Sequence, residues 1–365
     1  MARLEVMPHQ LVGYSNRNVL ITGHTGFKGA WLSAWLTKLG ARVTGFSLPK
    51  WDNDKFFTAL KPSLAINDRR GDVTDGAQVR AVIEATKPDI VFHLAAQPLV
   101  GASYQDPLGT FATNVTGTVH VLDAIRSHAP NAVAVMVTSD KCYKNDGRNQ
   151  GYVESDALGG SDPYSASKAA AEIVVSSYRN SFFGRGRIAS VRAGNIVGGG
   201  DHSTGRIVPD CIAALEAGLP VTLRNPGAVR PWQYVLDALY GYLLVGARLM
   251  AGDAGAASAW NFGPAPTPRV TVAEVADLVI ARWSEAESRR NSSATWRQAA
   301  IEQTWSEAKY LTLDSSKAQK LLDWRPRLSV EDALTATVEC YRKNSTNAFQ
   351  VTEQKLVDFM QLIEA

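Results

Sequence analysis

Three side chains that can exchange protons follow one another in the segment VTSDKCY. Ser139, Asp140 and Lys141 come directly after a run of β-forming residues, 133–137, so a strand is expected to end where they begin. Consecutive residues on a straight strand point to opposite faces. If the three side chains act together, the backbone must therefore turn at Ser139. The alternative interpretation is an exposed acid–lysine pair at a strand end, without chemistry.

A tyrosine and a lysine four residues apart form a second candidate pair. Tyr164 and Lys168, in DPYSASKAAAE, would share one face of a helix. A phenol loses its proton near pH ~10, and a neighbouring ammonium together with a nicotinamide cation is expected to lower that pKa. The tyrosine would then take the proton of a secondary alcohol while a hydride leaves its carbon. With 11 tyrosines in the chain, this spacing also arises by chance, so its position in the fold decides.

A glycine-rich turn lies near the N-terminus. LITGHTGFKGAWL places Gly23, Gly26 and Gly29 between a predicted strand over 18–22 and a predicted helix over 28–40. Glycines allow a tight turn that a pyrophosphate can approach, and the helix N-terminus supplies N–H groups and a positive dipole end. The alternative is an ordinary glycine-containing turn. Its place after the first strand of an alternating series favours a dinucleotide site.

The second strand ends without the acid that usually holds the adenosine ribose in dinucleotide folds. Ser47 stands at that position, with no arginine for a 2′-phosphate, so this position leaves NAD and NADP undecided. Asp72, after the third strand, is expected to hold the adenine, or alternatively to cap the next helix. Ala95 and Ala96, after the fourth strand, would let the backbone lie against the cofactor, or serve close packing.

The order of the predicted elements brings these motifs to one edge of a sheet. Strands are predicted over 18–22, 42–48, 64–68, 89–95, 132–139 and 187–194. They alternate with predicted helices over 28–40, 76–87, 106–128 and 162–183. This alternation predicts an α/β fold with a doubly wound, Rossmann-like parallel sheet covered on both faces. Open sheets of this kind bind ligands at the carboxyl ends of their strands, where Ser139 and Tyr164 would meet.

The alternation breaks after residue 194. Glycine- and proline-rich loops separate shorter helical patterns near 207–217, 234–250, 272–287, 316–323 and 330–343. We expect a Rossmann domain over 1–194, with residues 1–16 as an N-terminal extension. We expect a smaller α/β substrate-binding lobe over most of 195–365, interleaved with the first domain.

Bulk composition argues against several other classes of protein. The 365 residues carry a net charge of +3 and no long basic block, which argues against a nucleic-acid surface. No apolar run reaches the ~18 residues needed to span a membrane. Cys142, Cys211 and Cys340 lack CxxC spacing, and the 6 histidines lack ligand spacing, so we expect no metal and no disulfide framework. Reduced thiols are typical of a cytoplasmic protein.

Together these motifs resemble the extended short-chain dehydrogenase/reductase family. The resemblance covers nearly the whole chain, through the glycine turn, Ser139, the Tyr164–Lys168 pair and the segments HLAAQ, NVTGT, VRAGNIVG, RPWQYV and WNFGP. Longer segments resemble the sugar-nucleotide 4,6-dehydratases, in particular the branch that acts on CDP-glucose. They are GHTGFKGAWL, AAQPLV, TSDKCY, GGSDPYSASK, YRNSFF, RAGNIVGGGD, RIVPD and RNPGAVRPWQ.

The resemblance implies a reaction sequence. Tyr164, assisted by Lys168, would take the proton of the sugar C4 hydroxyl while hydride passes from C4 to NAD. The 4-keto group then acidifies C5, so that Lys141 would remove the C5 proton. Asp140 would protonate the departing C6 hydroxyl, with Ser139 on the C4 oxygen. Hydride returns to C6, and the product is a 4-keto-6-deoxy sugar for deoxysugar, surface polysaccharide and lipopolysaccharide biosynthesis.

The resemblance also implies the binding residues. Besides Tyr164 and Lys168, the expected NAD-binding set is Gly23, Thr25, Gly26, Phe27, Lys28, Gly29, Ser47, Asp72, Val73, Leu94, Ala95, Ala96 and Asn114. A diphosphate needs fixed positive charge, and a guanidinium suits it. The expected substrate-binding set is Gln97, Ser103, Tyr104, Asn195, Arg206, Arg224, Arg230 and Asn261. The alternative for Arg206 and Arg230 is an exposed position without a ligand.

The chain departs from the broader pattern at two positions. Many related dehydratases carry glutamate where Lys141 stands, although lysine matches the CDP-glucose branch. As a base, Lys141 would need its pKa lowered by burial and cationic neighbours; alternatively, it stabilises an enolate as a cation. Relatives often carry arginine where Gly101 stands, which bears on the substrate.

Several alternatives stay open at this point. The chain could be a dehydratase for another nucleotide sugar, an epimerase, or a non-catalytic NAD(P)-binding sensor on the same fold. The Tyr164–Lys168 pair and the Asp140–Lys141 pair argue against a sensor, which needs neither. The resemblance further implies a homodimer or a dimer of dimers, joined through a four-helix bundle of the helices over 106–128 and 163–183. Burial of their apolar stripes within one subunit is the alternative.

Overall fold

The computed structural model of the chain describes residues 7–49, 54–184, 186–265, 269–285, 295–299 and 310–365. Its centre is a 7-stranded parallel sheet in the order β10-β6-β5-β4-β1-β2-β3. The strands are β1 (Asn18–Thr22), β2 (Arg42–Ser47), β3 (Ile66–Arg70), β4 (Ile90–His93), β5 (Val133–Val137), β6 (Ile188–Ala193) and β10 (Ala259–Phe262). The predicted doubly wound parallel sheet is confirmed.

Helices connect and cover these strands. In the first half of the chain they are α1 (Phe27–Lys38), α2 (Lys55–Leu60), η2 (Lys61–Ser63), α3 (Gly76–Thr86), α4 (Val100–Gln105), α5 (Pro107–Phe111), η3 (Ala112–Thr116), α6 (Gly117–His128), η4 (Asp140–Cys142) and α7 (Pro163–Ser181). In the second half they are α8 (Ile207–Glu216), α9 (Val235–Met250), η5 (Ala254–Ala256), α10 (Val272–Glu285), α11 (Ser316–Leu322) and α12 (Val330–Glu364).

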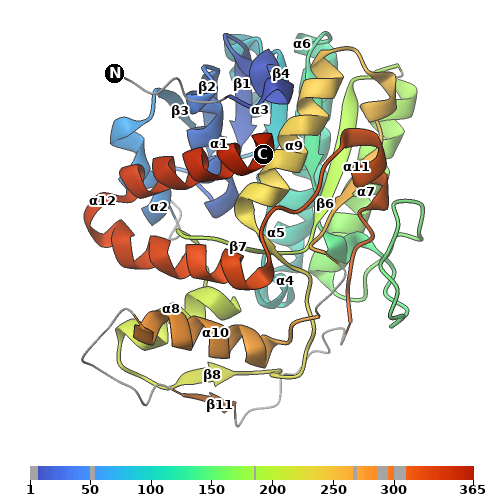
Figure 1. The fold of residues 1–365 in the computed structure, drawn as a ribbon. Coiled ribbons are helices and arrows are strands. Elements are labelled where there is room, and N and C mark those ends of the chain that lie inside the picture. The colour runs from blue at the N-terminus through green and yellow to red at the C-terminus, as the bar shows by residue number, and fades with distance from the viewer. Residues whose placement is uncertain (1–6, 50–53, 185, 266–268, 286–294, 300–309) are drawn as a thin grey trace, which may run out of the picture.

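Alternate strand residues pack into separate apolar cores on the two faces of the sheet. Leu20 and Val91 belong to the core beneath α3, α6 and α7. Ile21 and Phe92 belong to the larger core, which also contains the buried side chains of α1 and α9. Because both faces are covered, the strands read as nearly continuous apolar runs rather than as alternating ones. Figure 1 shows α9 crossing the sheet on the viewer's side.

The N-terminal segment belongs to the core rather than forming a loose extension. Residues 1–6 lie outside the described part of the chain, but His9–Tyr14 forms the 3₁₀ helix η1. Leu11 and Tyr14 are fully buried, and the Tyr14 hydroxyl donates a hydrogen bond to the Leu243 carbonyl at 2.7 Å. Leu11 and Tyr14 thus attach residues 9–14 to the sheet domain, against α9, and the extension expected over residues 1–16 stays a prediction for its first residues.

A smaller body lies beyond the carboxyl ends of the strands. It contains α8, α10 and the parallel pair of β8 (Val221–Leu223) with β11 (Trp296–Gln298) (Figure 1). A second parallel pair joins β7 (Asn195–Val197) to β9 (Trp232–Tyr234). In contrast, α9 packs on the sheet and β10 pairs with β6. The proposed division near residue 194 is thus crossed twice by the chain.

Two helices differ from their predicted form. The single helix expected over 106–128 is α5, a π-helical turn and α6 in succession. The helix expected over 330–343 continues as α12 to Glu364 across a kink at Asn347, where φ is −160° and ψ is 69°. Its second half packs on α1, with the Phe359 and Trp35 rings 5.7 Å apart. The second half of α12 is stabilised by contacts with residues far away in the sequence, and the local pattern of apolar residues does not reveal such contacts.

Candidate active site

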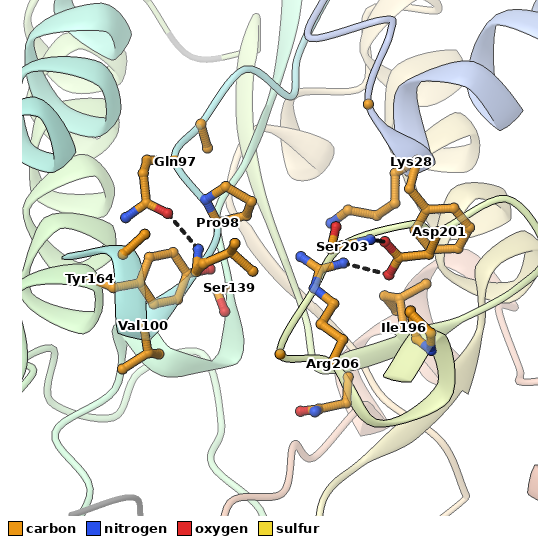
Figure 2. Close-up of a pocket in the computed structure, with 18 of the residues that line it drawn as sticks. Lys28, Gln97, Pro98, Val100, Ser139, Tyr164, Ile196, Asp201, Ser203 and Arg206 are labelled. Atoms are coloured by element: carbon orange, nitrogen blue, oxygen red, sulfur yellow. Dashed lines mark hydrogen bonds and ion pairs between the residues drawn. The ribbon is translucent and has the colours of Figure 1, made fainter. Parts of the chain in front are cut away.

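A cavity of about 780 Å³ lies beyond the carboxyl ends of the strands, between the sheet and the smaller body. Residues that directly follow β1, β3, β4 and β5 line one side of it, and the loops after β6 and β7 line the other. Figure 2 shows Tyr164 and Ser139 on one side of this cavity and Lys28, Asp201 and Arg206 facing them. This is the edge at which open parallel sheets bind ligands.

The glycine turn packs too closely for side chains at two of its positions. Gly23 has a φ of 76°, and a Cβ there would lie 2.7 Å from the Ala95 backbone nitrogen. A Cβ on Gly29 would lie 2.1 Å from the Gly23 carbonyl oxygen. The turn therefore runs directly into α1, and residues 25–29 line the cavity where that helix begins. This combination of close backbone and helix N-terminus fits a dinucleotide pyrophosphate.

The backbone turns after β5, as predicted. Ser139 is the N-cap of the 3₁₀ helix η4, and its Oγ accepts a hydrogen bond from Lys141 N at 3.2 Å. The same hydroxyl donates to Asp140 Oδ1 at 2.8 Å. Because the strand ends here, Ser139, Asp140 and Lys141 all line the cavity instead of pointing to opposite faces.

The carboxyl group of Asp140 retains hydrogen-bonding capacity inside this cavity. The side chain is 2% exposed. Within the described ranges, its Oδ2 is buried and has no hydrogen-bond partner. A buried carboxyl oxygen without a partner is unfavourable, and a substrate hydroxyl would remove that penalty. Lys141 is half-buried beside it.

Tyr164 and Lys168 lie one turn apart at the start of α7, which Asp162 caps by accepting a hydrogen bond from Ser165 N. Both side chains are buried and line the cavity. Burial raises the pKa of Tyr164 to about 12, although a hydrogen bond with Ser139 opposes the rise. Burial lowers the pKa of Lys168 to about 8, opposed by Cys142 and Glu172. In the protein without a nicotinamide, loss of hydration outweighs the nearby charges, and the lowering of this pKa expected from the lysine and a nicotinamide together stays a prediction.

The opposite wall carries a cluster of charges. Arg206 Nη1 donates to Asp201 Oδ2 at 2.8 Å, and Ser203 N donates to Asp201 Oδ1 at 3.1 Å (Figure 2). Burial lowers the pKa of Lys28 to about 7, and the neighbouring cations Lys168 and Arg206 lower it further. Asp140 and Asp201 oppose this lowering of the Lys28 pKa.

Two more arginines line this wall. Arg224 Nη2 donates to the Gly205 carbonyl at 2.6 Å, and Arg230 Nη1 donates to the Val229 carbonyl at 2.9 Å. Three guanidinium groups therefore border the cavity on the wall opposite Tyr164. Such a wall suits the diphosphate of a nucleotide sugar.

The family model for GDP-mannose 4,6 dehydratase matches residues 20–337. The chain belongs to this family. The chain is 41% identical over 336 residues to the CDP-glucose 4,6-dehydratase of Salmonella typhimurium, covering 90% of this chain and 91% of the relative. It is 26% identical to a dTDP-glucose 4,6-dehydratase of Xanthomonas campestris, over 90% of this chain and 93% of that protein. The 4,6-dehydratase class predicted from the motifs is thereby confirmed.

Solved structures agree in fold. The chain resembles a dTDP-glucose 4,6-dehydratase from Streptomyces venezuelae, solved with NAD and TYD bound, with a TM-score of 0.75. Identity is 23%, and the match covers 89% of this chain and 97% of that one. An epimerase from Methanothermobacter thermautotrophicus gives a TM-score of 0.77 at 22% identity, over 94% and 96% of the two chains. At these identities the fold is shared between dehydratases and epimerases, so the fold does not decide the reaction.

Most of the residues predicted for this dehydratase-family site line the one cavity. They include the five predicted catalytic residues, Gln97, Asn195, the three arginines and every predicted cofactor-binding residue except one. Gly101 also lines it, so no side chain occupies that stretch of wall. Asp201, Ser203 and Asn225 line it without having been predicted. Asp201 and Ser203 lie in the glycine-rich polar segment GGGDHSTG, which could have indicated their place in the site.

Four predicted residues do not line the cavity. Ser103 is buried beneath it, where its Oγ accepts a hydrogen bond from Tyr164 N at 3.2 Å. Tyr104 is 44% exposed on α4. Both were expected to touch the substrate, but α4 turns them away from the cavity. Ser103 instead supports the start of α7.

The two asparagines serve as scaffold. Asn114 Nδ2 donates to the Gln97 carbonyl at 3.1 Å and to Ser167 Oγ at 2.8 Å, so it ties the loop after β4 to α7. Asn261 is fully buried on β10, where its Oδ1 accepts from the Tyr143 hydroxyl at 2.7 Å. Neither asparagine lines the cavity in which the cofactor and the diphosphate are expected. Their side-chain amides are hydrogen-bonded to buried groups of the protein instead.

Neither a metal site nor a membrane segment is found among the residues that the structure describes. In those ranges, no group of three or more His, Cys, Asp or Glu side chains gathers as metal ligands do. Of the described helices, none has the length and hydropathy needed to cross a bilayer.

Proposed function

We propose that this 4,6-dehydratase converts CDP-glucose to CDP-4-keto-6-deoxyglucose, with NAD as a cofactor regenerated in each turnover. The observation that carries the proposal is the convergence of Ser139, Asp140, Lys141 and Tyr164 on one cavity. An oxidation alone needs the serine and the tyrosine. Elimination of water needs a further acid and a further base beside the sugar, and Asp140 with Lys141 meets that need.

Proton transfers assign one task to each side chain. Tyr164 Oη would take the proton of the C4 hydroxyl, and Ser139 Oγ would hold the C4 oxygen. Lys141 Nζ would remove the proton from C5, which the 4-keto group acidifies, and would donate a solvent-exchanged proton back to C5 at the end. Asp140 would donate a proton to the C6 hydroxyl, which departs as water. The unpartnered Oδ2 of Asp140 supports this role, since it has capacity for that hydroxyl.

Bound NAD would supply the hydride acceptor for C4 and the hydride donor for C6. The glycine turn and the N-terminus of α1 would hold its pyrophosphate, and Ser47 and Asp72 line the cavity where its adenosine would lie. Lys168 lies one turn beyond Tyr164 and would fix the nicotinamide ribose. A nicotinamide cation beside Tyr164 would also lower the phenol pKa, which burial raises in the protein alone.

The nucleotide is inferred from similarity and charge. The relative with 41% identity is a CDP-glucose 4,6-dehydratase. The resemblance noted in the sequence also implies that lysine at position 141 is typical of the CDP-glucose branch, where other dehydratases carry glutamate. Arg206, Arg224 and Arg230 would bind the diphosphate from the opposite wall.

The decisive experiment is incubation of the protein with CDP-, dTDP-, GDP- and UDP-glucose, each with and without added NAD. Mass spectrometry should show the loss of one water from CDP-glucose. Tyr164→Phe, with the same fold and no phenol, should leave CDP-glucose unchanged. Loss of water from another sugar nucleotide alone would reject the CDP assignment. An unchanged mass in every reaction, together with inversion at C4, would identify an epimerase instead.

We also propose that the protein works as a dimer or a dimer of dimers. Leu108 on α5 is 83% exposed and Ile173 on α7 is 59% exposed, and Tyr104 and Phe111 are exposed on neighbouring turns. Large apolar side chains gathered on adjacent helices favour a contact with a second copy of the same surface. A cytoplasmic location fits the three buried, unpaired cysteines and the nucleotide-sugar substrate.

A further inference from the structure

The serine at the end of β2 stands where dinucleotide-binding folds place an acid for the adenosine ribose. Ser47 lines the cavity together with Leu48, Gly71 and Asp72. A hydroxyl can donate or accept a hydrogen bond, so by itself it does not distinguish a ribose hydroxyl from a phosphate oxygen. The groups behind Ser47 decide which of the two it does.

A histidine from the glycine turn connects Ser47 to an acid on the next strand. His24 Nδ1 lies 3.0 Å from Ser47 Oγ, and His24 Nε2 lies 2.9 Å from Asp68 Oδ1 on β3. The imidazole is fully buried. A Cβ at position 45 would lie 2.2 Å from the ring, so β2 needs Gly45 to make room for it. Phe57 packs against the ring edge-on, with the ring centres 4.8 Å apart.

Hydrogen bonds from two cations keep the far end of this chain ionised. Arg70 donates to Asp68 from Nε at 2.7 Å and from Nη2 at 3.0 Å, and Lys61 Nζ donates at 2.7 Å. Burial opposes ionisation, but these hydrogen bonds outweigh it and hold the pKa of Asp68 well below its usual range. Burial lowers the pKa of His24 to about 4, so the imidazole is neutral near pH 7.

These charge states set the direction of every hydrogen bond in the chain. A carboxylate only accepts, so the hydrogen of the neutral imidazole lies on Nε2. His24 Nδ1 then has only a lone pair, and the Ser47 hydroxyl must donate its hydrogen to it. Thr25 N donates to Ser47 Oγ from 3.4 Å. Toward the cavity, Ser47 therefore offers a lone pair and no hydrogen.

We propose that Asp68, His24 and Ser47 form a relay that makes Ser47 Oγ a hydrogen-bond acceptor and thereby selects NAD, with a free ribose 2′-hydroxyl, over NADP. The inference rests on the proposed function of the cavity as a dinucleotide site. A ribose hydroxyl can donate to Ser47, as it donates to the acid in other dinucleotide folds. A 2′-phosphate presents acceptor oxygens, and the cations Arg70 and Lys61 are engaged by Asp68. The acid that other dinucleotide folds carry at the end of β2 is replaced here by Asp68 on the neighbouring strand β3. Asp68 acts on the ribose through His24 and Ser47.

Binding titrations of the full chain with NAD and with NADP test the relay. Calorimetry should give a dissociation constant for NAD about 10-fold or more below that for NADP. Ser47→Ala should weaken NAD binding about 3- to 10-fold, the usual worth of one hydrogen bond, and leave NADP binding unchanged. Ser33→Ala is the matched control, because Ser33 is a buried serine that does not line the cavity and bonds within α1 to Gly29.

Two outcomes overturn the proposal in different ways. Equal affinities for NAD and NADP, or a Ser47→Ala variant with unchanged NAD affinity, would reject the relay and leave the proposed function standing. Binding of neither dinucleotide would reject the relay together with the proposed function. Asp68→Asn frees Arg70 and should raise NADP affinity relative to NAD affinity.

The tautomer of His24 gives a readout that does not depend on ligand binding. In protein labelled with ¹⁵N in its imidazoles, two-bond ¹⁵N–¹H spectra show which ring nitrogen carries the hydrogen, and His24→Gln assigns the signal. We expect a neutral ring with the hydrogen on Nε2. A hydrogen on Nδ1 would overturn the relay, because the Ser47 hydrogen would then be free to face a phosphate.

Discussion

Glu172 and Arg192 form a buried ion pair next to the turn that carries Ser139, with Arg192 Nη2 2.7 Å from Glu172 Oε2. Thr138, which precedes Ser139, donates to the other carboxylate oxygen of Glu172. Arg192 Nη1 donates to the hydroxyl of Tyr143, which follows η4, at 2.6 Å. The pair therefore holds both ends of the segment that carries Ser139, Asp140 and Lys141. Burial opposes its charges, but Arg192 keeps the pKa of Glu172 below its ordinary value.

Removal of one partner of this pair should be strongly destabilising. Glu172→Ala leaves a guanidinium buried without its carboxylate, and we expect the free energy of unfolding to fall by about 3–5 kcal/mol. Urea denaturation followed by circular dichroism measures the change. Asp123→Asn is the control, since it breaks the exposed Asp123–Arg126 pair and should change stability by less than about 1 kcal/mol. Equal effects of the two substitutions would contradict this account.

A buried acid on α9 should give the folded state a distinct pH dependence. Burial raises the pKa of Asp237 to about 7, although the Arg327 and Leu328 amides donate to it. In the unfolded chain that pKa is about 3.9. Between these values the folded state binds the extra proton, so the contribution of Asp237 to stability falls as pH rises, by up to about 1.4 kcal/mol per pH unit.

Asp237→Asn isolates this effect. The stability of the variant minus that of the wild type should increase from pH 4.5 to pH 7 and level off above it. Urea unfolding of both proteins at several pH values provides the measurement. A difference that stays constant over this range would show that Asp237 does not titrate there.

Asp140→Asn should separate proton donation from the shape of the site. The amide can keep the hydrogen bond from Ser139, but it cannot protonate the C6 hydroxyl. We expect kcat for water loss to fall by about 10²- to 10⁴-fold, the usual contribution of a general acid, with little change in KM. Steady-state assays of product formation decide the point. A variant with unchanged kcat would remove Asp140 from the acid role.

Lys141→Ala should arrest the reaction one step later than Tyr164→Phe. Oxidation at C4 needs only Tyr164 and Ser139, whereas removal of the C5 proton needs Lys141. In deuterated buffer, the wild type should place deuterium at C5, and Lys141→Ala should place none while still oxidising C4 in a single turnover. Deuterium at C5 in the variant would assign the base to another residue.

The exposed apolar surface of α5 and α7 should control assembly. Ile173→Glu places a charge on this surface, and we expect it to shift the protein from dimer or tetramer to monomer, with the stability of the subunit changed by about 0.5 kcal/mol or less. Sedimentation velocity measures the assembly. Leu219→Glu is the matched control, because Leu219 is 62% exposed on a loop elsewhere. A monomeric wild type, or an unaltered assembly of Ile173→Glu, would reject this surface as the interface.

The spacing of neighbouring residues was sufficient to predict the helices and strands and the residues at which they begin or end. The alternation of strands and helices, the Gly23–Gly29 turn, and Tyr164 with Lys168 on one helix turn all follow from neighbours within a few residues, and the structure places each as expected. The turn at Ser139 was also predictable, since three polar side chains cannot continue a strand buried on both faces.

The sequence alone therefore determined the parallel α/β sheet, its edge of polar residues and the chemistry those residues can perform. Only the tertiary structure decided which polar side chains face the cavity and which are used up as scaffold. Asn114 and Asn261 bond to buried groups far away in the chain, while Asp201 and Arg206 come to face Tyr164. The physical reason is that a buried polar group must find a partner, and that partner is set by long-range packing rather than by sequence neighbours.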